Sequence, residues 1–402
     1  MDTPASANPP LPASATAAAT SAATAATTAT AADDTVLFVS VVGKVVLTAV
    51  IVTVVVVTYG ELDQLERSLD ALVRQDIQAD YEIIVVDNDP AAATARMVAL
   101  WAARSASHGA QLRYMAHEAR LRDEAAARNL GWRAARGDIV AFTGDDTVPA
   151  PDWLRQGLAA FDGVPTGAAA PGAAVNISVD AAVDAAASVV VDAAVDAVFG
   201  KVNATLPRHP SECQLKAQLR ESGDFAGCNW FATRKLLERL QGFDERFGDT
   251  ASVDTDMHFR LLDTKARVVA APAAQVSHPL PPLHWAASLS QLRALSGDAL
   301  LYKKHRQRYR QTIGQPPDWH DVVVAASLLL AAFGLWLGHE LLAVTAGGFW
   351  LVLTAMLSIR RLRDTPKKSS HIAAVLVTSL FMPPLALFWR LVGALKHRVP
   401  YA

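Results

Sequence analysis

The chain has 402 residues, of which 51% are hydrophobic and 19% are charged. This apolar content is high for a soluble protein, so the excess must lie either in a large core or in a bilayer. A formal net charge of −2 excludes a globally basic nucleic-acid-binding protein, and we expect no nucleic-acid partner. Two cysteines, Cys213 and Cys228, are too few for a disulfide framework or a four-thiolate zinc site.

The N-terminal region contains two different segments. Residues 1–34 consist mainly of Ala, Thr, Ser and Pro and are expected to form a disordered tail. Val36–Val57 is almost wholly apolar and is long enough for a membrane-spanning helix. Its β-branched residues and the central Gly43-Lys44 pair instead favour strands, because a lysine at mid-bilayer costs about 2.5–3.5 kcal/mol. We expect strands here, and the spanning helix remains the alternative.

Between Glu61 and Gly144 the sequence alternates between helical and strand patterns. We expect helices over Glu61–Gln75, Ala91–Ala103 and Glu124–Arg136, and strands over Tyr81–Val86, Leu112–Met115 and Asp138–Phe142. Such alternation predicts an α/β fold with a mostly parallel, Rossmann-like sheet covered on both faces. Ligands bind such sheets beyond the carboxyl ends of the strands.

The second half of the chain contains one biased stretch and a group of apolar blocks. Residues 165–205 are rich in Ala, Val and Asp and are interpreted as a low-complexity insert within a domain at 35–315. Gln315-Pro316-Pro317 marks a boundary, and 316–402 is predicted to be a membrane region. Its blocks at 322–338 and 341–359 predict a membrane hairpin, and 372–395 is a third apolar segment interrupted by Pro383-Pro384.

Basic residues flank the predicted hairpin on both sides. They are Lys303, Lys304, Arg306, Arg308 and Arg310 before it, and Arg360, Arg361, Arg363, Lys367 and Lys368 after it. The positive-inside rule then predicts a multi-pass protein of the cell (inner) membrane whose preceding domain lies on the cytoplasmic face. The third segment either crosses the bilayer or lies at its surface, and we expect the surface position.

Adjacent carboxylates follow the strand that ends at Phe142. Asp145 and Asp146 would repel each other at a buried strand terminus unless a hard cation such as Mg²⁺ or Mn²⁺ bound them. A solvated turn is the alternative explanation of this pair.

Between Val54 and His278 the sequence resembles the glycosyltransferase family 2 enzymes, which have the GT-A nucleotide-diphospho-sugar transferase fold. The matching stretches are VVVVTYG, IIVVDND, AAARNLGWRAARGDIVAF, GDDTVPAPDWL, GCNWFATRKLLERLQGFDERFG, VDTDMHFRL and VSHP, in this order. The resemblance implies a nucleotide-sugar donor. It also implies that Thr58, Tyr59 and Asp87 hold the nucleobase. Arg128 is expected near the diphosphate, with a salt bridge on the helix surface as the alternative, and Asp145 is expected to contact ribose or the metal.

The same resemblance implies a divalent metal, Mg²⁺ or Mn²⁺, bound by Asp146 and His278. Members of the family often carry a further acid where this chain has Gly144. For His278 a structural role is the alternative.

The catalytic base implied by the resemblance is Asp254. Val253 stands where the family usually has Glu, and either Asp254 or Asp256 could instead cap a helix. Asn229, Trp230 and Asp256 are expected on the acceptor side, where Trp230 could either stack on a sugar or be a core aromatic. Gln291-Leu292-Arg293-Ala294 lacks the Gln-x-x-Arg-Trp signature of processive synthases, so we expect transfer of one or few sugars.

Together these features predict a membrane-anchored, inverting, metal-dependent glycosyltransferase that acts on a lipid-linked or glycan acceptor. Surface polysaccharide or glycolipid synthesis is the expected process. Two alternatives remain: a polyprenyl-phosphate glycosyltransferase, and a catalytically inactive nucleotide-sugar-binding scaffold subunit.

Overall fold

The computed structural model describes most of the chain after residue 49. The described residues are 50–105, 108–118, 123–162, 194–208, 210–221, 225–248, 252–280, 284–314, 319–363, 365 and 367–399. The predicted tail at 1–34, the first part of Val36–Val57 and most of the low-complexity stretch lie outside them.

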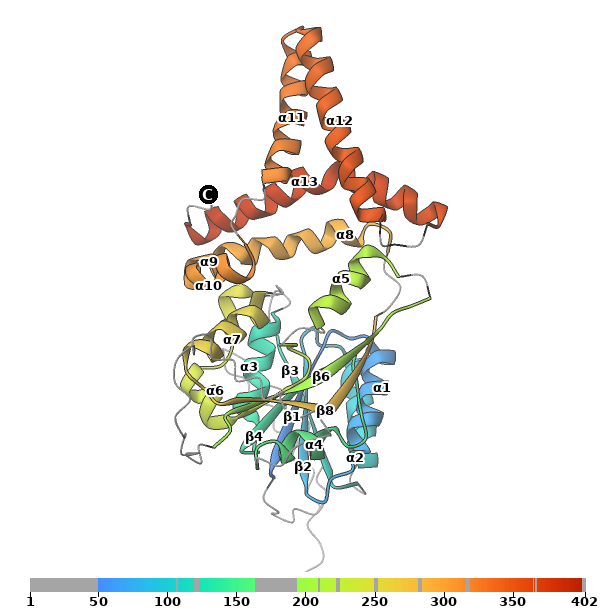
Figure 1. Ribbon diagram of the computed structural model, residues 1–402. Coiled ribbons are helices and arrows are strands. Elements are labelled where there is room, and N and C mark those ends of the chain that lie inside the picture. The colour runs from blue at the N-terminus through green and yellow to red at the C-terminus, as the bar shows by residue number, and fades with distance from the viewer. Residues whose placement is uncertain are drawn as a thin grey trace, which may run out of the picture. The chain divides into compact units, whose positions relative to one another are not determined.

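An eight-stranded mixed sheet forms the centre of the fold (Figure 1). Its strands are β1 Val52–Thr58, β2 Tyr81–Asp87, β3 Ala110–Ala116, β4 Ile139–Gly144, β5 Val148–Pro149, β6 Ala197–Thr205, β7 Trp230–Thr233 and β8 Val268–Pro279. The spatial order is β3-β2-β1-β4-β7-β6-β8-β5. β1 to β4 pair in parallel, β7 is antiparallel to both β4 and β6, and β5 is antiparallel to β8. The predicted α/β fold is confirmed, with antiparallel strands that the sequence pattern did not indicate.

Helices lie between and beyond the strands. They are α1 Leu62–Val73, α2 Ala92–Ser105, α3 Glu124–Ala134, α4 Trp153–Ala159, α5 Glu212–Glu221, α6 Arg234–Leu240, α7 Ser252–Asp263, α8 Ala287–Ser290, α9 Asp298–Lys304, α10 Arg306–Thr312, α11 Trp319–Trp336, α12 Glu340–Leu362 and α13 Ser369–His397. Two short 3₁₀ helices, η2 Glu245–Phe247 and η3 Gln291–Gly297, complete the set. The helices and strands expected between Glu61 and Gly144 are all present, with small differences at their ends.

The sheet is apolar on both faces because helices cover both. Within β1, Val54 and Val56 pack into the core on the side of α1, α2 and α4, whereas Val55 and Val57 pack on the side of α3, α6 and α7. All seven residues of β1 are buried. A continuous apolar run is the pattern expected for a strand buried on two faces, which explains its resemblance to a membrane segment in sequence.

The expected strand interpretation is confirmed for Val52–Val57, which belong to β1. The residues before 50 lie outside the described part of the chain, so the remainder of Val36–Val57 stays a prediction.

One boundary of the low-complexity stretch needs correction. Its last part, Ala197–Thr205, is strand β6, which lies in the sheet between β7 and β8. Ala197, Val198 and Phe199 are buried, so the Ala/Val bias in this part of the chain reflects a core strand.

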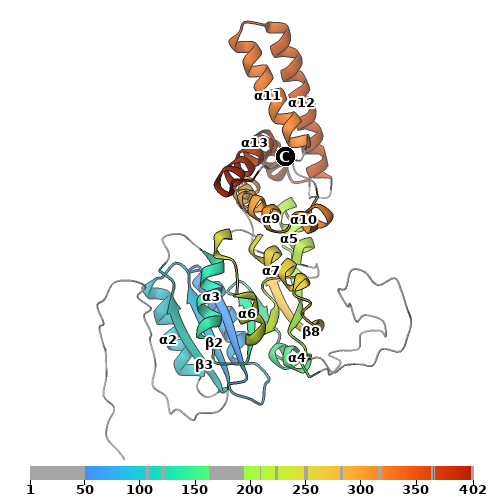
Figure 2. The ribbon, with the colours of Figure 1, turned by 90° about the vertical axis from the view of Figure 1, so that its left-hand side faces the viewer.

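The described residues include three helices that are long and apolar enough to cross a membrane: α11, α12 and α13. α11 and α12 pack against each other as the expected hairpin, and α13 is one continuous helix through Pro383 and Pro384. α13 contacts α9, η3 and both hairpin helices, and it lies across the base of the hairpin in Figures 1 and 2. The surface position expected for this segment stays a prediction, because α13 is also long and apolar enough to cross a membrane.

Candidate active site

The carboxyl ends of four strands meet at one edge of the sheet. In register, Thr58 at the end of β1 lies beside Asp87 at the end of β2, and Val57 lies beside Gly144 at the end of β4. β5, which directly follows Asp145-Asp146, pairs with β8 at Ser277, next to His278. The predicted donor and metal residues therefore lie at a common edge.

Asp145 is a buried carboxylate held by the end of β1. Its Oδ2 accepts a hydrogen bond from the Tyr59 backbone N–H at 3.4 Å, and the Thr58 hydroxyl donates to the same carboxylate. Burial raises the pKa of Asp145 to about 6, the Thr58 hydrogen bond opposes this rise, and the charge of Asp146 adds to it.

Asp146 points toward β8 and pairs with His278, with Oδ2 and Nε2 3.0 Å apart. Burial alone would raise the pKa of Asp146, but the hydrogen bond and charge of His278 lower it. A β-carbon on Gly144 would overlap the Asp146 carboxylate, so the glycine leaves room for this carboxylate.

A divalent cation fits the chemistry of this edge. In the described part of the chain no three His, Cys, Asp or Glu side chains are grouped as a metal site. Asp146 and His278, with Oδ2 and Nε2 3.0 Å apart, would be the cation's two protein ligands. Mg²⁺ is commonly bound through one or two carboxylates and completed by water and substrate phosphates. An acidic pair at an open sheet edge suits that kind of site better than a closed protein cage.

Asp87 is fully buried, and most hydrogen-bond acceptor positions of its carboxylate are filled. Its oxygens accept hydrogen bonds from the backbone N–H of Asp89 and of Ala91 and from the Tyr114 hydroxyl. Burial, followed by the charge of Asp87, raises the pKa of Tyr114. A carboxylate has about four acceptor positions, so one remains, and the predicted base contact stays a prediction.

Asp254 lies in the first turn of α7, and its side chain is 34% exposed. Its Oδ1 is 2.6 Å from Nη1 of Arg128, whose Nη2 pairs with Glu124. The guanidinium also lies 5.2 Å from the centre of the Phe243 ring. The positive charge of Arg128 helps to lower the pKa of Asp146, so the predicted base and the predicted metal ligand share one electrostatic site.

Gly227 allows this arrangement. A β-carbon at this position would overlap the carboxylate of Asp254, so the backbone of the Gly227 turn packs directly against the predicted base. Sequence patterns gave no sign of this contact, because it joins residues far apart in the chain.

The family model for glycosyl transferase family 2 matches residues 53–240. The match contains β1, β2, β4 and the edge that carries Asp145 and Asp146. The chain carries a family 2 glycosyltransferase domain. Glycosyltransferase AglE of Haloferax volcanii is 29% identical over 113 residues, which are 28% of this chain and 36% of that protein. The aligned part is thus little more than a third of the length of this curated relative.

Two solved glycosyltransferase structures are similar to the chain. The mannosyltransferase PcManGT of Pyrobaculum calidifontis, in complex with GDP-Man and Mn²⁺, aligns over 86% of each chain at 22% identity and a TM-score of 0.46. S. aureus TarS, in complex with UDP, aligns over 88% of this chain and 93% of its own at 14% identity and a TM-score of 0.42. Both scores lie below 0.5, so the family assignment depends on the sequence match.

The residues expected on the acceptor side of the glycosyltransferase domain are buried. Asn229 is 1% exposed, and its amide donates to the carbonyls of Lys201 and Ala274 while accepting from Nε1 of Trp153. Trp230 is fully buried and stacks on Phe142 at a centroid distance of 4.8 Å. Both belong to the core around the central strand β7, so in this structure neither presents a surface to an acceptor.

Asp256 also differs from its expected role. It is fully buried and lies 2.8 Å from Nε of Arg260, 2.6 Å from Nζ of Lys304 and 2.9 Å from Nε2 of His305. Burial would raise its pKa, but the His305 hydrogen bond and the charges of Arg260 and Lys304 lower it. The carboxylate of Asp256 thus links α7 to Lys304 in α9 and to His305, the residue that follows α9. Asp256 is therefore a structural anchor of the glycosyltransferase domain.

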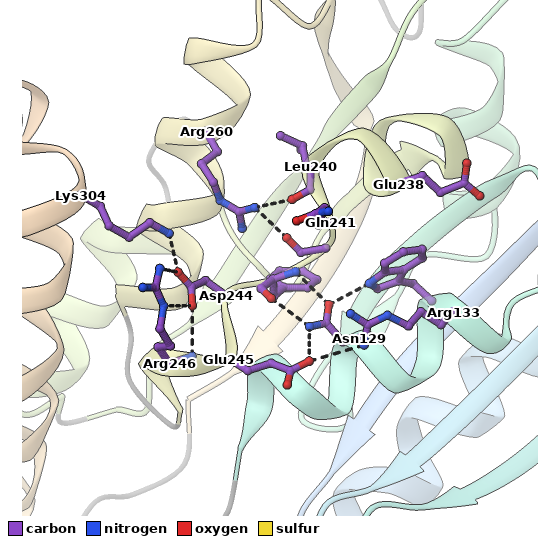
Figure 3. Close-up of a pocket in the computed structure, with 13 residues that line it drawn as sticks. Asn129, Arg133, Glu238, Leu240, Gln241, Asp244, Glu245, Arg246, Arg260 and Lys304 are labelled. Carbon is purple, nitrogen blue, oxygen red and sulfur yellow. Dashed lines mark hydrogen bonds and ion pairs between the residues drawn. The ribbon is translucent and has the colours of Figure 1, made fainter.

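A polar pocket of about 780 Å³ lies beside this anchor (Figure 3). On one side of it, Asn129 exchanges hydrogen bonds with the backbone N–H and C=O of Phe243 and donates to Glu245. On the other side, Asp244 accepts from Arg246 and Lys304. The Asn129 bonds fix the Phe243 ring that contacts Arg128, so this pocket helps to position the site.

Proposed function

We propose that this chain is a membrane-anchored, inverting glycosyltransferase that moves a sugar from a nucleotide-sugar donor to a membrane-associated acceptor in surface polysaccharide or glycolipid synthesis. The observation that supports it most is the position of Asp254, partly exposed and paired with Arg128 beside the Asp146–His278 pair. The α11–α12 hairpin anchors the domain at the inner membrane, with the glycosyltransferase domain on the cytoplasmic side.

In the proposed reaction the acceptor hydroxyl oxygen attacks the anomeric carbon and the bond to the donor diphosphate breaks. Asp254 takes the hydroxyl proton, and a single displacement of this kind inverts the anomeric configuration. A bound Mg²⁺ or Mn²⁺ at Asp146 and His278 would supply positive charge to the diphosphate.

Arg128 acts on both sides of this reaction. Its Nη1 lies 2.6 Å from Oδ1 of Asp254 and so fixes the position of this carboxylate. Its charge also helps to lower the pKa of Asp146, so the guanidinium lies near the edge where the diphosphate is proposed to bind, and Glu124 holds it in place. Loss of Arg128 therefore affects both the base and the leaving group.

Two departures from the family pattern, at Gly144 and Val253, motivate the inactive-scaffold alternative. Gly144 leaves room for Asp146, as described above. Val253 is 2% exposed and packs in the core near Met257. Both departures from the family pattern are compatible with a working enzyme.

Release of nucleoside diphosphate by purified full-length protein tests the proposal. GDP-mannose and UDP-sugars serve as donors, because the identity of the base remains open, and membrane extract with Mn²⁺ supplies the acceptor. We expect Asp254→Asn to abolish release while Asp263→Asn, an exposed change in the same helix, leaves it unchanged.

The same assay separates the remaining alternatives. Turnover that persists in Asp254→Asn would contradict the assignment of the base, and donor binding without any turnover would favour the scaffold. Label that moves from the donor to an acid-labile lipid would favour the polyprenyl-phosphate reaction, whereas label in polymer or glycolipid would favour the main proposal.

A further inference from the structure

A second pocket lies where the glycosyltransferase domain contacts the apolar helices. Its volume is about 450 Å³, and it is bounded by the start of α5, the residues just before α8, the end of α12 and the start of α13. These elements lie close together in Figure 1. The residues that matter below are Arg208, Glu212, Trp285, Arg361, Lys368 and His371.

The pocket carries more positive than negative charge. Glu212 is its one carboxylate among the described residues, and it pairs with Nε of Arg361 at 2.5 Å and with Nζ of Lys216 at 2.6 Å. No carboxylate in the described part of the chain pairs with Arg208 or Lys368, which are both exposed. Two cations are therefore available to an anion in the pocket.

The start of α13 adds hydrogen-bond donors to these charges. Lys368 occupies the N-cap position, and no side chain caps the helix there. The first turn supplies Ser370 and His371 to the pocket wall, and Nε2 of His371 is buried without a hydrogen-bond partner in the described structure. Free backbone N–H groups at a helix start and a nearby cation are a combination that binds phosphate.

The position of the pocket indicates where such a phosphate comes from. α12 ends at Leu362, just before the pocket residue Lys368, so the pocket lies at the membrane-side end of the domain if the hairpin spans the bilayer. Trp285, which lines the pocket, is 56% exposed, and tryptophan is enriched at membrane–water interfaces. A group bound here would lie at the depth of lipid head groups.

We propose that this pocket binds the phosphate of an anionic membrane lipid, through Arg208, Lys368 and the first turn of α13. The bound lipid joins the glycosyltransferase domain to α13, whereas the Arg361–Glu212 pair joins α5 to α12. This inference rests on the proposed membrane anchoring and is independent of the transfer reaction.

Thermal stabilisation of the full-length protein in detergent tests the site, because a ligand that binds only the folded state raises the unfolding midpoint. The probes are dioctanoyl phosphatidic acid, dioctanoyl phosphatidylcholine and inorganic phosphate. We expect phosphatidic acid to raise the midpoint most.

Two exposed substitutions, Arg208→Gln and Lys368→Gln, remove the cations with little risk to folding. Together they should weaken phosphatidic acid binding about 30-fold, since each Lys or Arg near a lipid surface contributes about 1 kcal/mol. Lys367→Gln, the exposed neighbour outside the pocket, is the matched control and should bind as the unmodified protein does.

Each other result would overturn the proposal. Equal stabilisation by phosphatidylcholine would show recognition of acyl chains, and equal stabilisation by inorganic phosphate would show a site for free phosphate. Unchanged binding in the double variant, or equal loss in Lys367→Gln, would exclude this pocket as the site. Asp254→Asn, which should lose turnover, is expected to retain lipid binding, so failure of the two proposals is distinguishable.

Discussion

A substitution at Asp256 tests most directly how the domain is attached to α9 and α10, the helices that precede the hairpin. Asp256→Asn removes the carboxylate that faces Arg260, Lys304 and His305, while the side-chain volume stays nearly the same. Removing one partner from a buried ion pair costs roughly 3–5 kcal/mol, because the other charge stays buried and unpaired.

The lower end of that range applies here. In the variant, Lys304 still has Asp244 as an ion-pair partner at 2.6 Å, and Arg260 still donates hydrogen bonds to the carbonyls of Leu240 and Gly242. We therefore expect a loss of about 3 kcal/mol in the free energy of unfolding, which at about 2–4 °C per kcal/mol lowers the unfolding midpoint by roughly 6–12 °C.

The assay is thermal unfolding of the full-length protein in detergent, compared with Asp263→Asn. Asp263 lies in the same helix and pairs with Arg308, but its side chain is 50% exposed, so its loss should cost within about 1 kcal/mol. Equal midpoints for the two variants would refute the reasoning, since Asp256 is fully buried among three cationic partners and Asp263 is half exposed.

The remaining predictions concern two glycines and acid stability. Gly144→Ala should displace the Asp146 carboxylate and raise the Mn²⁺ concentration needed for half-maximal activity about tenfold, measured by metal titration. Gly227→Ala should displace Asp254 and lower kcat about 100-fold, measured under donor saturation. Because folding lowers the pKa of Asp256, its stabilisation is present above its unfolded pKa of about 3.9 and is lost as the pH falls through the lower folded value. The midpoint difference between the unmodified protein and Asp256→Asn should therefore be constant near neutral pH and shrink below about pH 4.

Each of these has a result that would contradict it. Gly348→Ala, where no atom lies within 4 Å of the added β-carbon, is the control for both glycine variants and should leave activity unchanged. Unaltered metal dependence in Gly144→Ala, or unaltered kcat in Gly227→Ala, would show that the carboxylates have room to move. A midpoint difference that persists at low pH would mean that Asp256 stabilises the fold in its protonated form.

Local sequence patterns predicted the parts of the fold that depend on neighbours in the chain. The alternation from Glu61 to Gly144 gave the parallel half of the sheet, and the strand ends gave the edge with Asp145 and Asp146. The antiparallel strand β7 and the position of β6 depend on long-range pairing, so the local pattern could not supply them.

The same distinction between local patterns and long-range contacts explains which features of the site residues could be predicted. Trp230 has equal local signals for a sugar platform and for a core aromatic, and its position on a central strand buries it. The Arg128–Asp254 pair joins helices that are 126 residues apart in sequence, so only their packing reveals it. For Asp256, the i,i+4 relation to Arg260 was a usable local signal of a structural role.

Asp254 and Asp256 lie within one turn of α7 but make contacts with different parts of the protein. One carboxylate faces the edge where donor chemistry is expected, and the other is fixed to α9 and His305, which lead to the membrane hairpin. Because an α-helix rises about 1.5 Å per residue, the base and the anchor are separated by about 3 Å along the helix axis. If the hairpin spans a bilayer as proposed, a shift of α9 relative to α7 would reach the proposed base over this short distance. We therefore expect turnover to depend on the choice of detergent.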